Sequence, residues 1–301
     1  MLGMTSPILI IGGTGKTGRR VAARLQERGL PVRIGSRNGA PPFDWEDRAT
    51  WAPALQGTRA AYVSYFPDIA VPGAPDAIAE LARVALAGGT RRLVLLSGRG
   101  EEEAERAEQA QRSGVQRLVL LSGRGEEEAQ RSEQVVAAAG IDWTVVRCSW
   151  FNQNFSEGYM LDPILGGEVA LPAGDVPEPF VDAEDIADVA VAALTEDGHA
   201  GEIYELTGPR LLTFAEAVAE IGRATGRELR YVEVSMDEYA AAAAEQDIPD
   251  DVAWLIRYLF SEVLDGRNAK LADGVQRALG RDPRDFADFA RSASASGAFD
   301  A

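Results

Sequence analysis

The sequence predicts an α/β protein with a doubly wound parallel sheet and a smaller α+β lobe at its C-terminal end. An apolar run at residues 8–11 leads directly into a glycine-rich turn and then into a helical pattern. Apolar runs and helical patterns alternate from there to about residue 148, which is the βαβ rhythm of a parallel sheet. Beyond that point the rhythm loosens into short strands and helices. We therefore expect a nucleotide-binding domain over residues 1–155 and a substrate-binding lobe over residues 156–301.

The composition excludes several classes of partner. The chain has 301 residues, a net charge of −17 and a pI of about 4.6. Nucleic acids and anionic membrane surfaces both require a basic face, so neither is an expected partner. No signal peptide or membrane-spanning run is visible. The single cysteine, Cys148, excludes internal disulfides and is typical of a reducing compartment, so we expect a cytoplasmic protein.

The turn after the first strand has the spacing of a phosphate cradle, Gly-Gly-Thr-Gly-Lys-Thr-Gly over residues 12–18. A strand, a tight turn and a helix N-terminus place free N–H groups and the positive end of the helix dipole beside a bound phosphate. An ATP-binding P-loop needs a glycine five positions before Gly15, where this chain has Ile10. A plain strand–helix turn is the remaining alternative. The predicted cofactor contacts in this turn are Gly12, Thr14, Gly15, Lys16, Thr17 and Gly18.

The end of the second predicted strand, residues 30–35, indicates which dinucleotide is bound. An acid at this position selects NAD, but here Ser36 and Arg37 follow the strand and no acid precedes Asp44. Arg37 suits a 2′-phosphate and Ser36 can add a hydrogen bond, so the sequence favours NADP(H) over NAD(H). A solvated loop arginine is the alternative for Arg37. Residues 43–45 predict a short third strand, with Asp44 as a contact to the base.

Two later strand ends predict further contacts. The strand over residues 60–66 should bring Ser64 to the cofactor's edge, because ligands bind beyond the strand ends in these sheets. The strand over residues 142–147 is followed by aromatic and amide side chains, which suit a substrate pocket beside the nicotinamide. A packed loop with capping amides is equally compatible with the pattern. The predicted pocket residues are Trp150, Phe151, Asn154 and Phe155.

A tandem repeat interrupts the chain: residues 92–116 recur as residues 117–141, and 16 of the first 18 positions are identical. Both strands could enter the sheet, one could be displaced to the surface, or the displaced strand could pair with a second chain and form a homodimer. We favour the first outcome, because it buries both apolar strands. The consecutive glutamates of each copy cannot converge on one ion, so we expect no metal site.

These motifs together resemble the NmrA-like proteins of the atypical short-chain dehydrogenase/reductase superfamily. The resemblance implies an NAD(P)-binding Rossmann domain and a smaller substrate lobe. It also implies either an NAD(P)H-dependent reductase of quinones or dyes, or a redox-sensing regulator that binds the dinucleotide without turning it over. The matching segments are GGTGKTGRRVA (12–22), GSR (35–37), FDWEDRATW (43–51), LVLLSGRGEEEA in both copies, DWTVVRCSWFNQNFSEG (142–158), PEPFVDAEDIADVA (177–190) and YELTGP (204–209).

The chain departs from active members of that superfamily because no tyrosine is followed by a lysine four residues later. No catalytic residue can therefore be assigned. Ser122, or its twin Ser97 in the first copy, matches the family's serine position and is expected to contact the cofactor. We favour an NADPH-dependent reductase of quinone-like or other small aromatic acceptors, because hydride transfer can proceed by positioning with a solvent proton. A non-catalytic NAD(P)-sensing regulatory protein is the alternative.

Overall fold

The structure is a computed structural model that describes residues 6–98, 124–244 and 256–300. The chain forms two compact units that alternate along the sequence. Unit one comprises Met1–Arg147 and Ala187–Tyr204, and unit two comprises Cys148–Ile186 and Glu205–Ala301. The single domain boundary expected after residue 155 stays a prediction.

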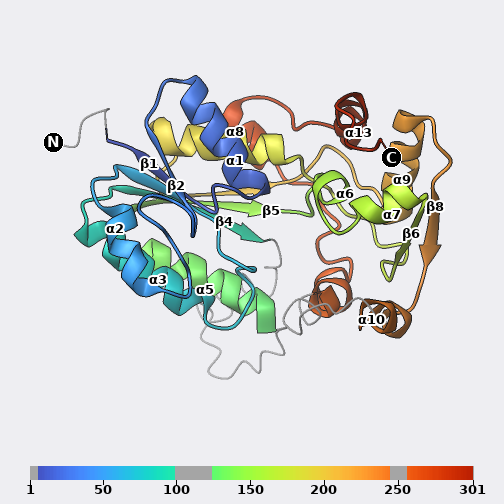
Figure 1. The fold of residues 1–301 in the computed structure, drawn as a ribbon, viewed down its shortest axis with the longest axis horizontal. Coiled ribbons are helices and arrows are strands. Elements are labelled where there is room, and N and C mark those ends of the chain that lie inside the picture. Colours follow the sequence, from blue (N-terminus) through green and yellow to red (C-terminus); the bar gives the residue numbers. More distant parts are fainter. Residues whose placement is uncertain (1–5, 99–123, 245–255, 301) are drawn as a thin grey trace, which may run out of the picture. The chain divides into compact units, whose positions relative to one another are not determined.

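Unit one is built around a six-stranded, mostly parallel sheet, which confirms the predicted fold class (Figure 1). The strand order is β2-β1-β3-β4-β5-β7, and β1 pairs in parallel with β2 and β3 on its two sides. All four residues of β1 are fully buried, as expected for a parallel strand covered by helices on both faces. The strands are β1 (Ile8–Ile11), β2 (Val32–Gly35), β3 (Ala60–Val63), β4 (Arg92–Gly98), β5 (Asp142–Cys148) and β7 (Glu202–Leu206).

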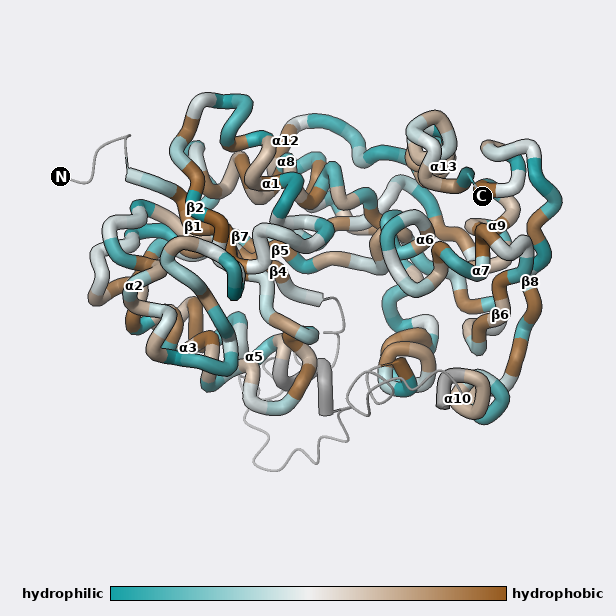
Figure 2. The backbone as a smooth tube through the Cα atoms, in the orientation of Figure 1, coloured by the Kyte–Doolittle hydropathy of each residue, from teal (hydrophilic) through white to brown (hydrophobic). Residues whose placement is uncertain are grey.

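Helices cover both faces of this sheet: α1 and α8 lie on one side, and α2, α3 and α5 on the other (Figure 1). Arg24 of α1 pairs with Asp188 of α8 at 2.6 Å, which joins the first layer. Hydrophobic residues, brown in Figure 2, are concentrated in the sheet around β1 and β7. The helices are α1 (Lys16–Glu27), the 3₁₀ turn η1 (Arg48–Thr50), α2 (Trp51–Leu55), α3 (Ala74–Ala87), α5 (Arg124–Ala138) and α8 (Ala183–Thr195).

Unit two contains a small parallel sheet, β6 (Glu168–Leu171) with β8 (Arg230–Glu233), and a core of aromatic side chains. Phe155 lies at its centre, with ring centroids 5.6 Å from Phe180 and 5.4 Å from Phe286. A capping box is present at the start of α9, where the side chains of Thr213 and Glu216 each accept a backbone N–H of the other residue. The helices are α6 (Asn154–Glu157), α7 (Leu161–Gly166), α9 (Phe214–Thr225), α10 (Met236–Ala244), the π-helix η2 (Leu259–Val263), α12 (Gly274–Leu279) and α13 (Phe286–Ala295).

The strand predicted at residues 43–45 is absent, so that prediction was wrong. Phe43 and Trp45 pack edge to face, with ring centroids 5.1 Å apart, and Trp45 packs in the same way on Trp51 at 5.5 Å. The backbone oxygen of Asp44 accepts a hydrogen bond from Trp51 Nε1 at 2.6 Å. The apolar residues of this segment are therefore buried by aromatic packing, without a partner strand.

The two copies of the repeat together supply one strand–helix unit of the described structure. Strand β4 comes from the first copy and lies between β3 and β5, whereas α5 comes from the second copy and packs on α3. The strand of the second copy, residues 118–121, lies outside the described residues. The hypothesis that both strands enter the sheet therefore stays a prediction, as does the homodimer.

Deleting residues 99–123 should leave a complete fold. The deletion retains every described element, and its product equals that of deleting residues 92–116, because residues 117–123 repeat residues 92–98. We expect cooperative urea unfolding, with a free energy of unfolding equal to that of the full chain or higher by up to ~1 kcal/mol, because the connection between β4 and α5 is shorter. A deletion of the same length over residues 124–148 removes α5 and β5, and should not fold. Non-cooperative unfolding of the first variant would contradict this prediction.

Candidate functional site

The glycine-rich turn of unit one joins the carboxyl end of β1 to the first turn of α1. Gly12 adopts a left-handed backbone conformation with φ of +74°, which favours glycine. Gly15 occupies the N-cap position without any side-chain capping bond, and the first turn of α1 carries no acid. The first N–H groups of a helix have no partner within the helix. The turn therefore offers uncapped donors and the positive end of the helix dipole to an anion.

Close packing explains one further glycine, Gly18, and one threonine, Thr17, of the turn. A Cβ on Gly18 would lie 2.2 Å from the carbonyl oxygen of Gly12, so α1 can approach the turn only with glycine there. Thr17 is buried, and its hydroxyl accepts a hydrogen bond from Tyr62 of β3 at 2.9 Å. The side chain of Thr17 thus anchors α1 to the sheet, which leaves its backbone for the predicted cofactor contact. Thr14 and Gly15 are exposed, and Lys16 is half-buried.

The ends of β2 and β3 lie beside this turn. Gly12 donates its N–H to the carbonyl oxygen of Gly35 at 3.1 Å, and a Cβ on Gly12 would lie 3.1 Å from the Cβ of Ser64. Ser36 is half-buried, and its carbonyl oxygen closes the following loop. Arg37 is exposed, and its guanidinium has no hydrogen bond or ion pair to any described residue. The predicted contacts on three strand ends therefore meet at one edge of the sheet.

The predicted base contact, Asp44, is half-buried in the loop that follows β2. One of its carboxylate oxygens accepts the N–H of Glu46 at 3.1 Å, which fixes the turn. Trp45 of the same loop donates its Nε1–H to the carbonyl oxygen of Ser64 at 3.3 Å. This bond places the loop at the end of β3, on the same edge as the glycine turn. A contact between Asp44 and a base stays a prediction.

The serine that the family resemblance implies as a cofactor contact has two candidates. Ser122 lies outside the described residues, whereas its twin Ser97 lies near the carboxyl end of β4 and is buried. Ser97 donates a hydrogen bond to Glu133, and Glu133 pairs with Arg147. Sequence reasoning missed both charged partners. A charged residue at the end of the apolar β5 strand was the available signal for Arg147.

The predicted substrate residues all belong to unit two and differ in exposure. Trp150, Phe151 and Asn154 are half-buried, whereas Phe155 is fully buried in the aromatic core. Sequence reasoning missed Asn152, which is fully buried and whose amide nitrogen and oxygen form no hydrogen bond with the described residues. Buried amides are nearly always hydrogen-bonded, so Asn152 is a further candidate for contact with a polar group.

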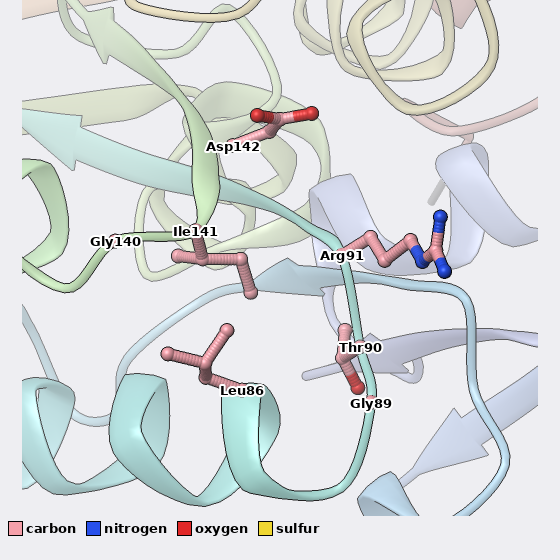
Figure 3. Close-up of a pocket in the computed structure, with 7 residues that line it drawn as sticks. All are labelled: Leu86, Gly89, Thr90, Arg91, Gly140, Ile141 and Asp142. Atoms are coloured by element: carbon pink, nitrogen blue, oxygen red, sulfur yellow. The ribbon is translucent and has the colours of Figure 1, made fainter.

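A shallow hollow of about 530 Å³ lies at the opposite edge of the sheet, before β4 and β5 begin (Figure 3). Leu86 and Ile141 face each other across it, while the side chains of Arg91 and Asp142 point away. It therefore offers no converging polar groups to a ligand. In the described ranges, no group of three or more His, Cys, Asp or Glu side chains could hold a metal ion, and no helix is both long and apolar enough to cross a bilayer.

Comparison with known proteins agrees with this geometry. A family model described as NAD(P)H-binding matches residues 12–197, more than half of the chain. The chain belongs to this NAD(P)H-binding family. An NAD(P)H azoreductase from Xenophilus azovorans is 32% identical, and the match covers 96% of this chain and 98% of the relative. The family is thus one of oxidoreductase-like proteins.

Solved structures share the fold of this NAD(P)H-binding protein. The NADPH complex of the NADPH-dependent quinone oxidoreductase QOR2 from Escherichia coli has a TM-score of 0.73 and 21% identity, and covers 95% of this chain and 99% of that one. Nmra, a negative transcriptional regulator, has a TM-score of 0.67 and 17% identity, and covers 97% of this chain and 96% of that one. The expected resemblance to NmrA-like proteins is thus confirmed at the level of the fold.

Proposed function

We propose that this NAD(P)H-binding protein is an NADPH-dependent reductase of quinone-like or other small aromatic acceptors. The observation that carries the proposal is the uncapped first turn of α1, which lies beside the exposed Arg37 at one edge of the sheet. The turn suits a pyrophosphate, and the unpaired guanidinium suits the 2′-phosphate of NADP(H). The quinone and azo-dye substrates in the names of similar proteins support the acceptor class.

In this proposal the chain binds and orients its ligands and has no residue that transfers a proton. When bound, NADPH would supply the hydride, and water would supply the proton that completes the reduced acceptor. The glycine turn and Arg37 would hold the cofactor. Trp150, Phe151 and Asn154 would contact the acceptor, with Phe155 behind them in the aromatic core. The absence of a Tyr-x-x-x-Lys motif is compatible with this division of work.

The second candidate function is an NAD(P)-sensing regulatory protein. It is favoured by the absence of a Tyr-x-x-x-Lys motif and by the structural likeness to Nmra, a negative transcriptional regulator. A sensor needs the glycine turn and Arg37 but no acceptor site. In either function, we propose a cytoplasmic location, where the one buried cysteine stays reduced.

NADPH oxidation against a panel of quinones and azo dyes tests the two functions. Cofactor saturation should be confirmed in the same sample by quenching of tryptophan fluorescence. We expect turnover with at least one acceptor and a kcat/KM for NADPH well above that for NADH. Saturable NADPH binding without turnover across the panel would contradict the reductase and support the sensor.

A further inference from the structure

Three polar side chains from three different elements meet near the carboxyl ends of β4 and β5. Ser97 Oγ of β4 donates a hydrogen bond to Glu133 Oε1 of α5 at 2.6 Å. Arg147 of β5 donates from Nη2 to Glu133 Oε2 at 2.7 Å, and from Nε to both carboxylate oxygens at 3.1 Å. Ser97 is 4% exposed, and the side chains of Glu133 and Arg147 are 5% and 11% exposed. The three groups therefore form one nearly dry network.

The network fixes the direction of the Ser97 hydroxyl. A carboxylate held by a guanidinium has no proton to give, so Glu133 can only accept from Ser97. The single hydroxyl proton of Ser97 therefore points to Glu133. The lone pairs of Ser97 Oγ can still accept a hydrogen bond from another group. No described residue donates a hydrogen bond to Ser97 Oγ. Ser97 is thus an oriented acceptor without a donor inside the described protein.

Burial of this ion pair also requires an explanation. Removing two charges from water costs free energy that the pair regains only with good geometry, and apolar side chains of the same volume often stabilise a fold as well. Apolar side chains could therefore hold α5 on the sheet without any charged groups. An oriented hydroxyl needs an acceptor-only neighbour, and the Glu133 carboxylate, which Arg147 keeps ionised, is such a neighbour and holds the Ser97 proton away from a ligand.

The position of Ser97 in the sheet indicates which part of a bound dinucleotide would lie near its hydroxyl. The glycine turn lies at the end of β1, and Arg37 follows β2, so the adenosine half of a dinucleotide would extend toward β2. The nicotinamide half would then extend the other way, across β3 toward β4. Two strand spacings, about 10 Å, separate β1 from β4. The carboxamide of nicotinamide carries N–H donors of the kind that Ser97 lacks.

We infer that Ser97 accepts a hydrogen bond from the carboxamide N–H of a bound nicotinamide. Glu133, held by Arg147, is the positioning residue that commits the Ser97 proton. The inference rests on the proposed use of NADP(H) as cofactor. It gives the chain a contact at the reacting end of the cofactor that does not require the missing Tyr-x-x-x-Lys motif.

The test compares dissociation constants of three ligands, measured by tryptophan fluorescence on the full chain. NADP⁺ carries the carboxamide, its 3-acetylpyridine analogue lacks the N–H donors, and 2′-phospho-ADP-ribose lacks the nicotinamide. We expect wild type to bind NADP⁺ about fivefold more tightly than the analogue, the size of one hydrogen bond. Ser97→Ala should reduce this ratio to about one and leave the affinity for 2′-phospho-ADP-ribose unchanged.

Conservative variants separate positioning from a purely structural role. Ser97→Thr retains the hydroxyl and should restore the ratio. Glu133→Gln should reduce the ratio although Ser97 is intact, because the amide can donate to Ser97 and turn its proton toward the ligand. A network that only stabilises the fold would lower the melting temperature or weaken all three ligands together, without changing the ratio.

Two results would overturn the inference: a ratio unchanged in Ser97→Ala, or a ratio that falls in Ser122→Ala while Ser97→Ala is normal. Failure of wild type to bind 2′-phospho-ADP-ribose would contradict the cofactor on which the inference rests. Absence of turnover with the expected ratios would count against the reductase alone, because the ratios are measured without an acceptor.

Discussion

Replacing Gly15 with valine is expected to weaken NADPH binding by at least about 100-fold, or ~2.7 kcal/mol, while the protein stays folded. Gly15 caps α1 where the N–H donors would meet the pyrophosphate, and the branched side chain would occupy the space of the ligand. Each hydrogen bond to a charged group is worth about 1.5–3 kcal/mol, so the loss of one or two accounts for this magnitude. Isothermal titration with NADPH measures the effect.

The fold should tolerate this change, because the backbone of Gly15 has φ of −79° and its added Cβ would contact only the Gly12 carbonyl oxygen, at 3.3 Å. Gly18 is unsuitable for the same test, since its added Cβ would clash with the turn itself. Gly166→Val is the matched control, because a Cβ there meets no atom within 4 Å. Wild-type affinity in Gly15→Val would mean that the turn does not hold the pyrophosphate.

Replacing Arg37 with glutamate is expected to reverse the cofactor preference. NADPH binding should weaken by roughly 100-fold, through loss of charge-assisted bonds and repulsion of the 2′-phosphate. NADH binding should stay within about threefold of wild type or improve, because an acid at this position can bind the ribose 2′-hydroxyl. The measurement is the ratio of the two dissociation constants.

Net charge needs a control in this experiment, because the chain already carries −17 and both cofactors are anions. Arg48→Glu makes the same charge change at another exposed arginine of unit one, whose guanidinium lies 5.6 Å from the Trp51 ring centroid. It should weaken both cofactors equally and slightly. Equal weakening of NADPH and NADH by Arg37→Glu would remove the role of Arg37 in recognising the 2′-phosphate.

Local patterns were sufficient to predict the sheet and the glycine turn. The apolar run of β1, the turn and the amphipathic α1 are adjacent in sequence, so periodicity and spacing determine them. The strand predicted at residues 43–45 failed for the opposite reason. Its aromatic side chains are buried against Trp51 and the end of β3, and a sequence pattern does not distinguish that packing from strand pairing.

The network around Ser97 could not be predicted, because packing brings its members together. Ser97 and Glu133 are 36 residues apart in the chain, and the repeat supplies an identical serine at position 122, only 11 residues before Glu133. The sequence alone cannot decide which copy supplies β4. The sequence also could not show that Asn152 is the buried amide without a hydrogen bond to a described residue. The segment that follows β5 carries two asparagines and a glutamine, and the pattern does not distinguish among them.

One measurement tests the central claim most directly. Enzyme saturated with NADPH is mixed anaerobically with each quinone of the panel, and the loss of reduced-nicotinamide absorbance is compared with the quinol formed. With at least one quinone, we predict one equivalent of quinol for each NADPH oxidised by wild type, and a rate close to the uncatalysed one with Gly15→Val at the same NADPH concentration. Equal rates for wild type, Gly15→Val and buffer would contradict a reductase that binds its hydride donor at the glycine turn.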